Sequence, residues 1–216
     1  MNAVCLIAAA LLLFLARNTQ GQTTNAASAP ALEGSTNSWT FSAFAYIYFV
    51  PNDRDYVNPI LTADHNWLHL EARYNYEARE TGSLWVGYNF SFGRSLVLGV
   101  TPMLGGVFGN LTGVAPGCEL SLTWRRLALS VQNEYVFDTG DGLLSFYYNW
   151  SELSYSPADW FRVGLAIQRT KLYHSEQDIQ RGFLVGFNYR KSTFTTYVFN
   201  LGWTAPTIVF AAGVQF

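Results

Sequence analysis

Five polar or charged residues that could bind ions or select between them occupy every second position of one short stretch. They are His69, Glu71, Arg73, Asn75 and Glu77, and the positions between them carry Leu, Ala and Tyr. A β-strand sends alternate side chains to opposite faces, so this stretch predicts a strand with one charged and one apolar face. Imidazole, carboxylate and guanidinium groups in one row can pair with each other or tune the selectivity of a water-filled conduit.

Other predicted strands place polar side chains on the same face. Counting back from the tight turn at Arg125–Arg126 puts Glu119 opposite Gln132, with Glu134 one diagonal away, so two carboxyl groups are expected close together. The complete set of predicted inward-facing polar residues is His69, Glu71, Arg73, Asn75, Glu77, Asn89, Glu119, Gln132, Glu134, Glu152, Arg162, Gln168, Asn188 and Arg190.

Two arginines on this face need a counter-charge. A symmetric outer loop would place Arg162 directly opposite Arg190, and counting from the Ser156–Asp159 turn brings Glu152 beside Arg162. Strict alternation points Glu152 to the other, apolar face, where a carboxylate is costly. We therefore predict a β-bulge near Asn149–Ser151 that turns Glu152 inward.

Catalytic, metal and cofactor patterns are weak. His174-Ser175-Glu176 supplies the residue types of a hydrolase, but neighbours in a loop cannot point at one another in a relay. The glycines around Gly105-Gly106 are followed by no helix, which removes the basis of a phosphate loop. The acidic residues of the loops lack calcium-loop spacing. The sequence predicts no catalytic residue, no metal and no cofactor.

The composition favours a membrane barrel. Half of the 216 residues are hydrophobic and 17% aromatic, whereas only 13% are charged, and the mean hydropathy is +0.08. So few charges would hardly cover a soluble surface, and that hydropathy is too low for a bundle of membrane helices. A barrel whose strands alternate between lipid and a polar lumen gives this intermediate value. The net charge of -2 argues against a nucleic-acid partner.

Turn signals divide the chain into long strands without any helical period. The predicted strands are Trp39–Val50, Asp55–Ala63, Trp67–Ala78, Leu84–Phe92, Ser95–Val107, Gly117–Trp124, Leu127–Phe137, Leu143–Tyr155, Trp160–Leu172, Ile179–Arg190, Thr193–Leu201 and Thr207–Phe216. Pro59 weakens the second, but without it the number would be odd, and bacterial single-chain barrels have even numbers. We predict an all-β transmembrane antiparallel up-and-down barrel of 12 strands over residues 39–216.

The N-terminal region is expected to lie outside the barrel. Residues 1–21 combine an apolar run with small residues before a plausible cleavage point at Gln22, which is typical of a signal peptide, although MNAVC carries no Lys or Arg. Residues 22–38 predict a flexible periplasmic tail; the alternative is a plug inside the barrel.

Large aromatic residues gather at the strand ends, as in the two interfacial girdles of membrane barrels. The residues assigned to these girdles are Trp39, Trp67, Trp85, Trp124, Trp160, Tyr189, Trp203 and Phe216.

The final stretch, TIVFAAGVQF, alternates strictly and ends on Phe216. It resembles the closing strand of Gram-negative outer-membrane β-barrels of the porin or channel class. The resemblance implies a bacterial outer-membrane location, contact with outer-membrane lipid and lipopolysaccharide, and recognition of this strand by the barrel-assembly machinery.

For function, we expect a porin-like channel that passes small hydrophilic solutes, because inward-facing glycines such as Gly105, Gly186 and Gly213 leave room in the lumen. One alternative is a closed-lumen structural or accessory barrel that binds partner proteins. A remote one is a lipid hydrolase, a class that also includes outer-membrane barrels of this size. The lipid-facing wall shows no obvious polar stripe.

Overall fold

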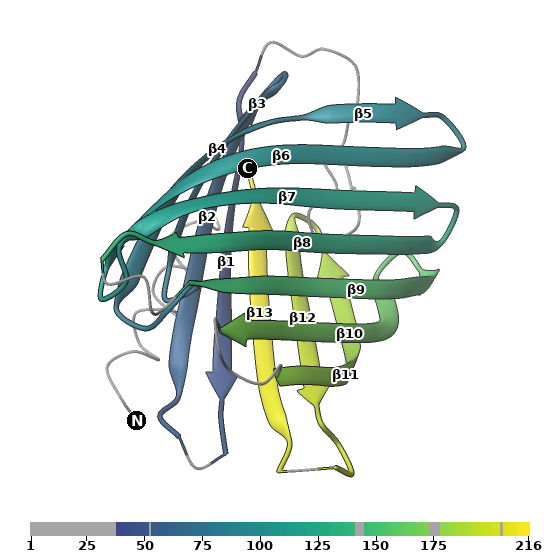
Figure 1. The fold of residues 1–216 in the computed structure, drawn as a ribbon. Helices are drawn as coiled ribbons and strands as arrows, with labels where there is room; N and C mark the ends of the chain where they lie inside the picture. Colours follow the sequence, from purple (N-terminus) through teal and green to yellow (C-terminus); the bar gives the residue numbers. More distant parts are fainter. Residues whose placement is uncertain (1–37, 52, 141–144, 173–177, 204) are drawn as a thin grey trace.

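The computed structural model describes residues 38–216 apart from 52, 141–144, 173–177 and 204 (Figure 1). The predicted signal peptide, almost all of the predicted tail and the stretch His174–Glu176 lie outside these residues. The described part of the chain contains no helix that is long and apolar enough to cross a membrane.

The described residues form a closed, antiparallel all-β barrel. Its strands are β1 (Thr40–Phe49), β2 (Tyr56–His65), β3 (Leu68–Tyr74), β4 (Thr81–Tyr88), β5 (Phe90–Gly93), β6 (Leu96–Gly109), β7 (Gly113–Trp124), β8 (Leu127–Asp138), β9 (Phe146–Ala158), β10 (Phe161–Leu172), β11 (Asp178–Tyr189), β12 (Ser192–Phe199) and β13 (Thr207–Gln215).

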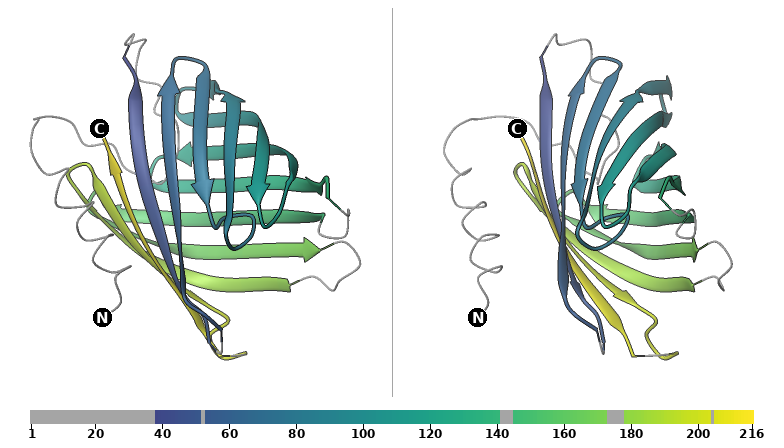
Figure 2. Two further views of the ribbon diagram at one scale, coloured as in Figure 1. Left: turned by 90° about the vertical axis from the view of Figure 1, so that its left-hand side faces the viewer. Right: turned by 60° about the vertical axis from the view of Figure 1, so that its left-hand side comes forward.

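Apart from β4 and β5, which do not pair with each other, each strand pairs with its neighbours in sequence, and two further pairings close the ring. The last strand, β13, pairs with β1, and β4 pairs with β6. Because β4 and β5 both lie along β6 and are separated by Asn89 alone, they are two parts of one barrel strand. The predicted barrel of 12 strands is confirmed, with its fourth strand interrupted at Asn89. Figure 2 shows the tilted strands closing around the interior.

Several predicted strand bounds were wrong. Strand β3 ends at Tyr74 and not at Ala78, because Asn75 adopts a φ of 57° and forms a turn. The Asn75 side chain donates to the Val57 carbonyl at 2.9 Å and accepts from the Glu80 amide at 2.7 Å. Strand β9 continues to Ala158, so the turn predicted at Ser156–Asp159 is shorter, and β2 pairs through Pro59 despite its missing N–H.

The two ends of the barrel differ. At the end that we call the turn end, neighbouring strands are joined by tight turns, several with a residue at positive φ, such as Asn66, Arg125 and Arg190. The opposite end, here the loop end, carries the longer connections, including residues 50–55 and 200–206.

Apolar side chains cover the outside of the barrel, as a lipid-facing wall requires. Among the predicted interfacial aromatics, all but Trp85 are exposed: Trp39, Trp67, Trp124, Trp160, Tyr189 and Phe216 at the turn end, and Trp203 at the loop end. The assignment of Trp85 was wrong. Its side chain is only 3% exposed and lies inside the barrel, because Trp85 shares the inward face of β4 with Ser83.

Candidate functional site

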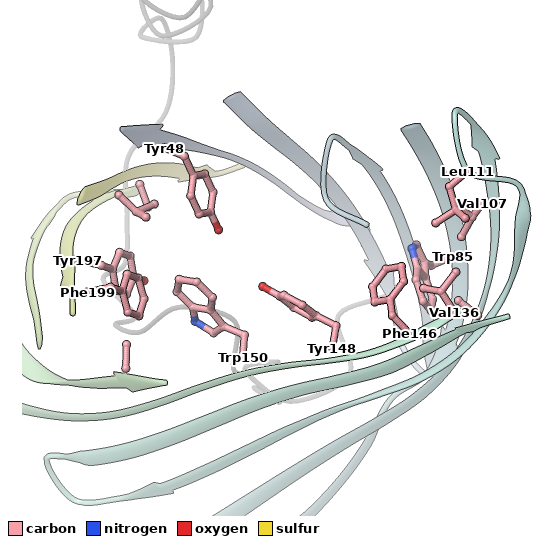
Figure 3. Close-up of a cluster of buried hydrophobic side chains, with 14 of the residues drawn as sticks. Tyr48, Trp85, Val107, Leu111, Val136, Phe146, Tyr148, Trp150, Tyr197 and Phe199 are labelled. Carbon is pink, nitrogen blue, oxygen red and sulfur yellow. The ribbon is translucent and has the colours of Figure 1, made fainter. Parts of the chain in front are cut away.

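The interior of the barrel is crossed by large aromatic side chains. Figure 3 shows Tyr48, Tyr148, Trp150, Tyr197 and Phe199 pointing from the walls into the space that the strands enclose. Trp150 on β9 meets Tyr197 and Phe199 of β12 edge-on, with ring centroids 5.2 and 5.5 Å apart. These contacts join two strands that are not neighbours, so this aromatic cluster fills part of the lumen.

A second group, the Arg73 cluster, consists of Arg73 and four carboxyl groups. Arg73 lies 2.8 Å from Glu71 on its own strand and 2.7 Å from Glu134 on β8. Glu119 of β7 lies at 3.7 Å and Glu77 at 3.9 Å. Strands β3 and β8 are not neighbours, so the contact between Arg73 and Glu134 spans the lumen. The guanidinium also stacks on Trp85, at 4.5 Å from the ring centroid.

Hydrogen bonds extend the Arg73 cluster toward the turn end. His69 lies between two carboxyl groups, with Nδ1 at 2.8 Å from Asp64 and Nε2 at 3.4 Å from Glu71. The Asn89 amide donates to Asp64 at 2.8 Å and accepts from the Thr101 hydroxyl at 2.7 Å. The break between β4 and β5 thus places Asn89 in this network.

On the other side, Gln132 connects Glu119 to the loop end. The Gln132 amide donates to Glu119 at 3.0 Å and accepts from the Tyr76 hydroxyl at 2.7 Å. Glu119 and Gln132 are register partners on β7 and β8, which agrees with the count from the Arg125–Arg126 turn.

The extended Arg73 cluster has an excess of acid. Five carboxyl groups (Asp64, Glu71, Glu77, Glu119 and Glu134) face one guanidinium and one imidazole. One oxygen each of Glu77 and Glu134 is buried without a hydrogen-bond partner. A buried carboxylate without a partner is costly, so this part of the interior favours additional positive charge. Within the described ranges, no three His, Cys, Asp or Glu side chains are arranged to hold a metal ion.

A third group surrounds Glu152 and is called the Glu152 cluster. Glu152 accepts hydrogen bonds from the Trp150 indole and the Tyr197 hydroxyl, both at 2.7 Å, and lies 3.4 Å from Arg162. Arg162 also donates to the Thr195 hydroxyl at 2.7 Å. The predicted proximity of Glu152 and Arg162 therefore holds.

The predicted bulge at Asn149–Ser151 does not exist. Strand β9 keeps unbroken register there with both β8 and β10, and the irregularity lies near its end, opposite Phe161–Val163. Glu152 points inward by plain alternation, because Tyr148 and Trp150 on the same face also point inward. The prediction failed because it assigned the aromatic face to lipid.

The remaining predicted residues are scattered. Arg162 is opposite Gly186 and not Arg190, which lies in an exposed turn beside Tyr189. Gln168 pairs in register with Gln180, and Asn188 donates to the Asp159 carbonyl near the turn end. Sequence reasoning omitted Asp64 and the inward aromatic residues Tyr48, Tyr148 and Tyr197. The alternation of β2 could have indicated Asp64, since Asn58, Thr62 and Asp64 share one face.

Comparisons with known proteins identify the architecture. No family model and no curated protein matches the sequence. Among solved structures, the KdgM porin in complex with disordered oligogalacturonate matches with a TM-score of 0.57 and 12% identity, over 82% of this chain and 98% of that chain. The outer-membrane protein Omp33 of Acinetobacter baumannii matches with a TM-score of 0.50 and 10% identity, over 82% and 98%. The chain has the fold of outer-membrane porins.

The inward glycines do not leave open space in this porin fold. A Cβ atom on Gly105 would lie 2.5 Å from the Trp85 ring, and one on Gly186 would lie 2.6 Å from Arg162. At Gly213 the neighbour is Phe44, at 2.3 Å. Each glycine therefore makes room for a large neighbouring side chain, and the expectation of free space at these positions was wrong.

A small polar cavity remains in the interior. Its volume is about 30 Å³, and its lining includes Tyr46, Glu119, Gln132, Trp150 and Glu152. This volume accommodates about two water molecules. The cavity lies between the Glu152 cluster and the carboxyl group of Glu119, so it connects two of the charged groups described above.

An ion pair joins two loop-end connections of the porin fold. Arg79 donates to both carboxylate oxygens of Asp53, at 3.1 and 2.7 Å, and to the Arg54 carbonyl at 3.0 Å. These hydrogen bonds from Arg79 hold the pKa of the Asp53 carboxyl below its ordinary value.

We expect Arg79→Gln to raise the pKa of Asp53 toward its ordinary value, since the main stabilising partner of the carboxylate is removed. With the pKa lowered in the folded state, the pair stabilises the loops at neutral pH and loses this effect as pH falls through the folded pKa. The measurement is an NMR titration of the Asp53 carboxyl carbon. Arg126→Gln, at the turn end beside Asp159, is the matched control and should leave the Asp53 titration unchanged. An unchanged Asp53 pKa in Arg79→Gln would contradict the assignment.

Proposed function

We propose that this protein is an outer-membrane channel that passes small hydrophilic solutes and prefers cations. The proposal rests on the contrast between an apolar outer wall and a charged interior. The charged groups of the interior begin near the turn end with Asp64 and His69 and continue toward the loop end as far as Glu77. Charged side chains along the interior of a barrel set the selectivity of a pore. The porin fold agrees with this role.

The preference for cations follows from the acid excess of the extended Arg73 cluster. A permeating cation gains attraction from carboxyl groups that a single guanidinium and an imidazole do not balance. The KdgM porin was solved with oligogalacturonate, an acidic sugar polymer. The acid excess in the interior of the present chain disfavours such an anion, so we do not assign it that solute.

A second candidate function is a closed barrel that serves partner proteins. Its support is the burial of the charged side chains: those of Arg73 and Glu71 are each 2% exposed, and that of Glu77 is 0% exposed. Side chains along an open, water-filled pore would be more accessible. The channel proposal thus requires a narrow path for solutes, and side chains of the interior must move to open this path.

The test is the current through the refolded barrel in a planar lipid bilayer under a salt gradient. We expect small, discrete steps whose reversal potential has the sign of cation selectivity. Glu119→Gln should move this potential toward zero, because Glu119 lines the cavity and carries part of the excess charge. Asp159→Asn, exposed in a turn, is the matched control. A folded barrel without current would favour the closed alternative, and anion selectivity would contradict the proposal.

The location and the partner of the last strand belong to the same proposal. Strand β13 pairs with β1 along eight register positions and so closes the barrel. This role supports recognition of the C-terminal strand by the barrel-assembly machinery. We propose no catalytic activity: the hydrogen-bond partners of His69 are both carboxyl groups, so it lacks the hydroxyl nucleophile of a hydrolase.

A further inference from the structure

The outer wall carries polar side chains on β8, β9 and β10, contrary to the expectation from the sequence. Asn149 is the register partner of both Asn133 and Arg169. The Asn149 amide donates to Asn133 at 2.8 Å and accepts from the Ser151 hydroxyl at 3.0 Å, and the Tyr147 hydroxyl donates to Asn133 at 2.6 Å. These residues face outward because the aromatic residues and Glu152 of β9 occupy the inward face.

The neutral groups of this region bond to each other, whereas its two arginines contact aromatic rings. Arg169 lies 5.9 Å from the centroid of the Tyr147 ring, and Arg181 on β11 lies 5.8 Å from that of Trp203. Arg169 pairs with Ile179 and Arg181 with Ile167, so the two arginines are diagonal neighbours on one face. Within the described residues, no carboxylate forms an ion pair with either, and Nε of Arg169 is buried without a partner.

The position of the two arginines along the strands sets their depth. Arg169 lies three residues from the loop-end terminus of β10, and Arg181 lies three residues from that of β11. Arg169 follows the turn-end residue Trp160 by nine positions, which corresponds to roughly 20 Å along the barrel axis for a strand tilted by about 45°. The apolar band of such barrels is about 25 Å tall. The arginines are therefore near the headgroup level of the leaflet at the loop end.

We propose that Arg169 and Arg181 form a binding site for the phosphate groups of a membrane lipid at the loop end. The inference rests on the proposed outer-membrane location, where the outer-leaflet lipid with this chemistry is lipopolysaccharide. Arg169 lies beside Tyr147 of β9 and Arg181 beside Trp203, so each guanidinium can bind one of the phosphate groups through charge-assisted hydrogen bonds. Tyr147 and Trp203 provide flat apolar surfaces beside them, which suit the upper part of the acyl chains. The positive charge and its depth fit an anionic lipid, and among the described side chains no carboxylate forms an ion pair with either arginine.

The test is a native mass-spectrometry titration of the refolded chain in detergent with lipid A that carries both phosphates. The Arg169→Gln, Arg181→Gln double variant should bind this lipid at least roughly tenfold more weakly, since it loses several charge-assisted hydrogen bonds. The Arg169→Lys, Arg181→Lys variant should retain most of the affinity because it keeps both charges. The matched control, Arg94→Gln with Arg190→Gln, removes two exposed arginines at the turn end and should bind like the parent chain.

Four results would overturn the inference. The first two are equal binding of lipid A stripped of its phosphates and an equal loss in the turn-end control. The third is full displacement of the lipid by millimolar inorganic phosphate, which would make a free anion the ligand. The fourth is self-association without lipid that the Gln pair abolishes, which would assign the face to a second copy. Lipid binding is measured in detergent and does not depend on conductance. A barrel that binds lipid A but does not conduct would therefore contradict the proposed channel function and still support the lipid site.

Discussion

Arg73→Met is expected to destabilise the barrel by about 3–5 kcal/mol, the cost of breaking a buried ion pair by removing one partner. The substitution leaves Glu71, Glu119 and Glu134 buried around an apolar side chain, and it removes a contact that spans the lumen. The loss of the Trp85 stacking contact adds to this cost. The measurement is urea unfolding of the barrel refolded into lipid vesicles, followed by tryptophan fluorescence.

Two further variants distinguish the effect of the buried charges on stability from the effect of any substitution. Glu134→Gln should be neutral or stabilising, because it removes one carboxylate from a cluster with an acid excess and keeps the side-chain shape. Arg79→Met breaks an exposed ion pair and should cost less than about 1 kcal/mol. Equal losses of stability in Arg73→Met and Arg79→Met, or a loss in Glu134→Gln as large as that in Arg73→Met, would contradict the role given to Arg73.

The second large effect is expected from Trp150→Ala. Trp150 lines the interior cavity and packs against Tyr46, Tyr197 and Phe199, so its removal connects the cavity to the space that the indole filled. We expect a several-fold rise in single-channel conductance with cation selectivity retained, because the acidic groups remain in place. Truncation of a buried Trp should also destabilise the barrel, by about 3–5 kcal/mol. The measurement is single-channel recording of parent and variant in the same bilayer.

The matched control is Trp124→Ala, which truncates the same side chain on the outer wall. It should leave the conductance unchanged. If both variants conduct like the parent chain, Trp150 does not obstruct the permeation path, and the aromatic cluster is a structural element alone.

The barrel architecture could be predicted from the sequence, because the alternation of apolar and polar residues along a strand is a local pattern. The register of Glu119 with Gln132 and most of the twelve barrel strands followed from period-two patterns and short turns, and the Pro59 strand was retained because such barrels have even strand numbers. Such turns fix the pairing of the two strands that they join, so contacts between these strands can be counted along the chain. The same count across a longer connection failed for Arg162 and Arg190.

Contacts across the lumen could not be counted in this way. The pairing of Arg73 with Glu134 and the packing of Trp150 on Tyr197 depend on the cross-section of the barrel and on the side chains that fill its interior. The error at Glu152 arose because the aromatic face of its strand was assigned to lipid, whereas this barrel buries many aromatic residues inside. Hydrophobicity alone does not separate the two faces of a strand when the interior is packed.

The uneven distribution of exposed aromatic residues has a consequence for bilayers of different thickness. Among the described residues, the exposed Trp and Tyr side chains toward the loop end are Tyr74 and Trp203, whereas those toward the turn end are Trp39, Trp67, Tyr88, Trp124, Tyr155, Trp160 and Tyr189. Interfacial Trp and Tyr side chains resist displacement from the headgroup region. When the hydrocarbon layer becomes thinner or thicker, the turn end keeps its depth in the headgroup region. The difference in thickness therefore changes the depth of the loop end. Membrane thickness therefore sets how far the outer connections stand above the lipid.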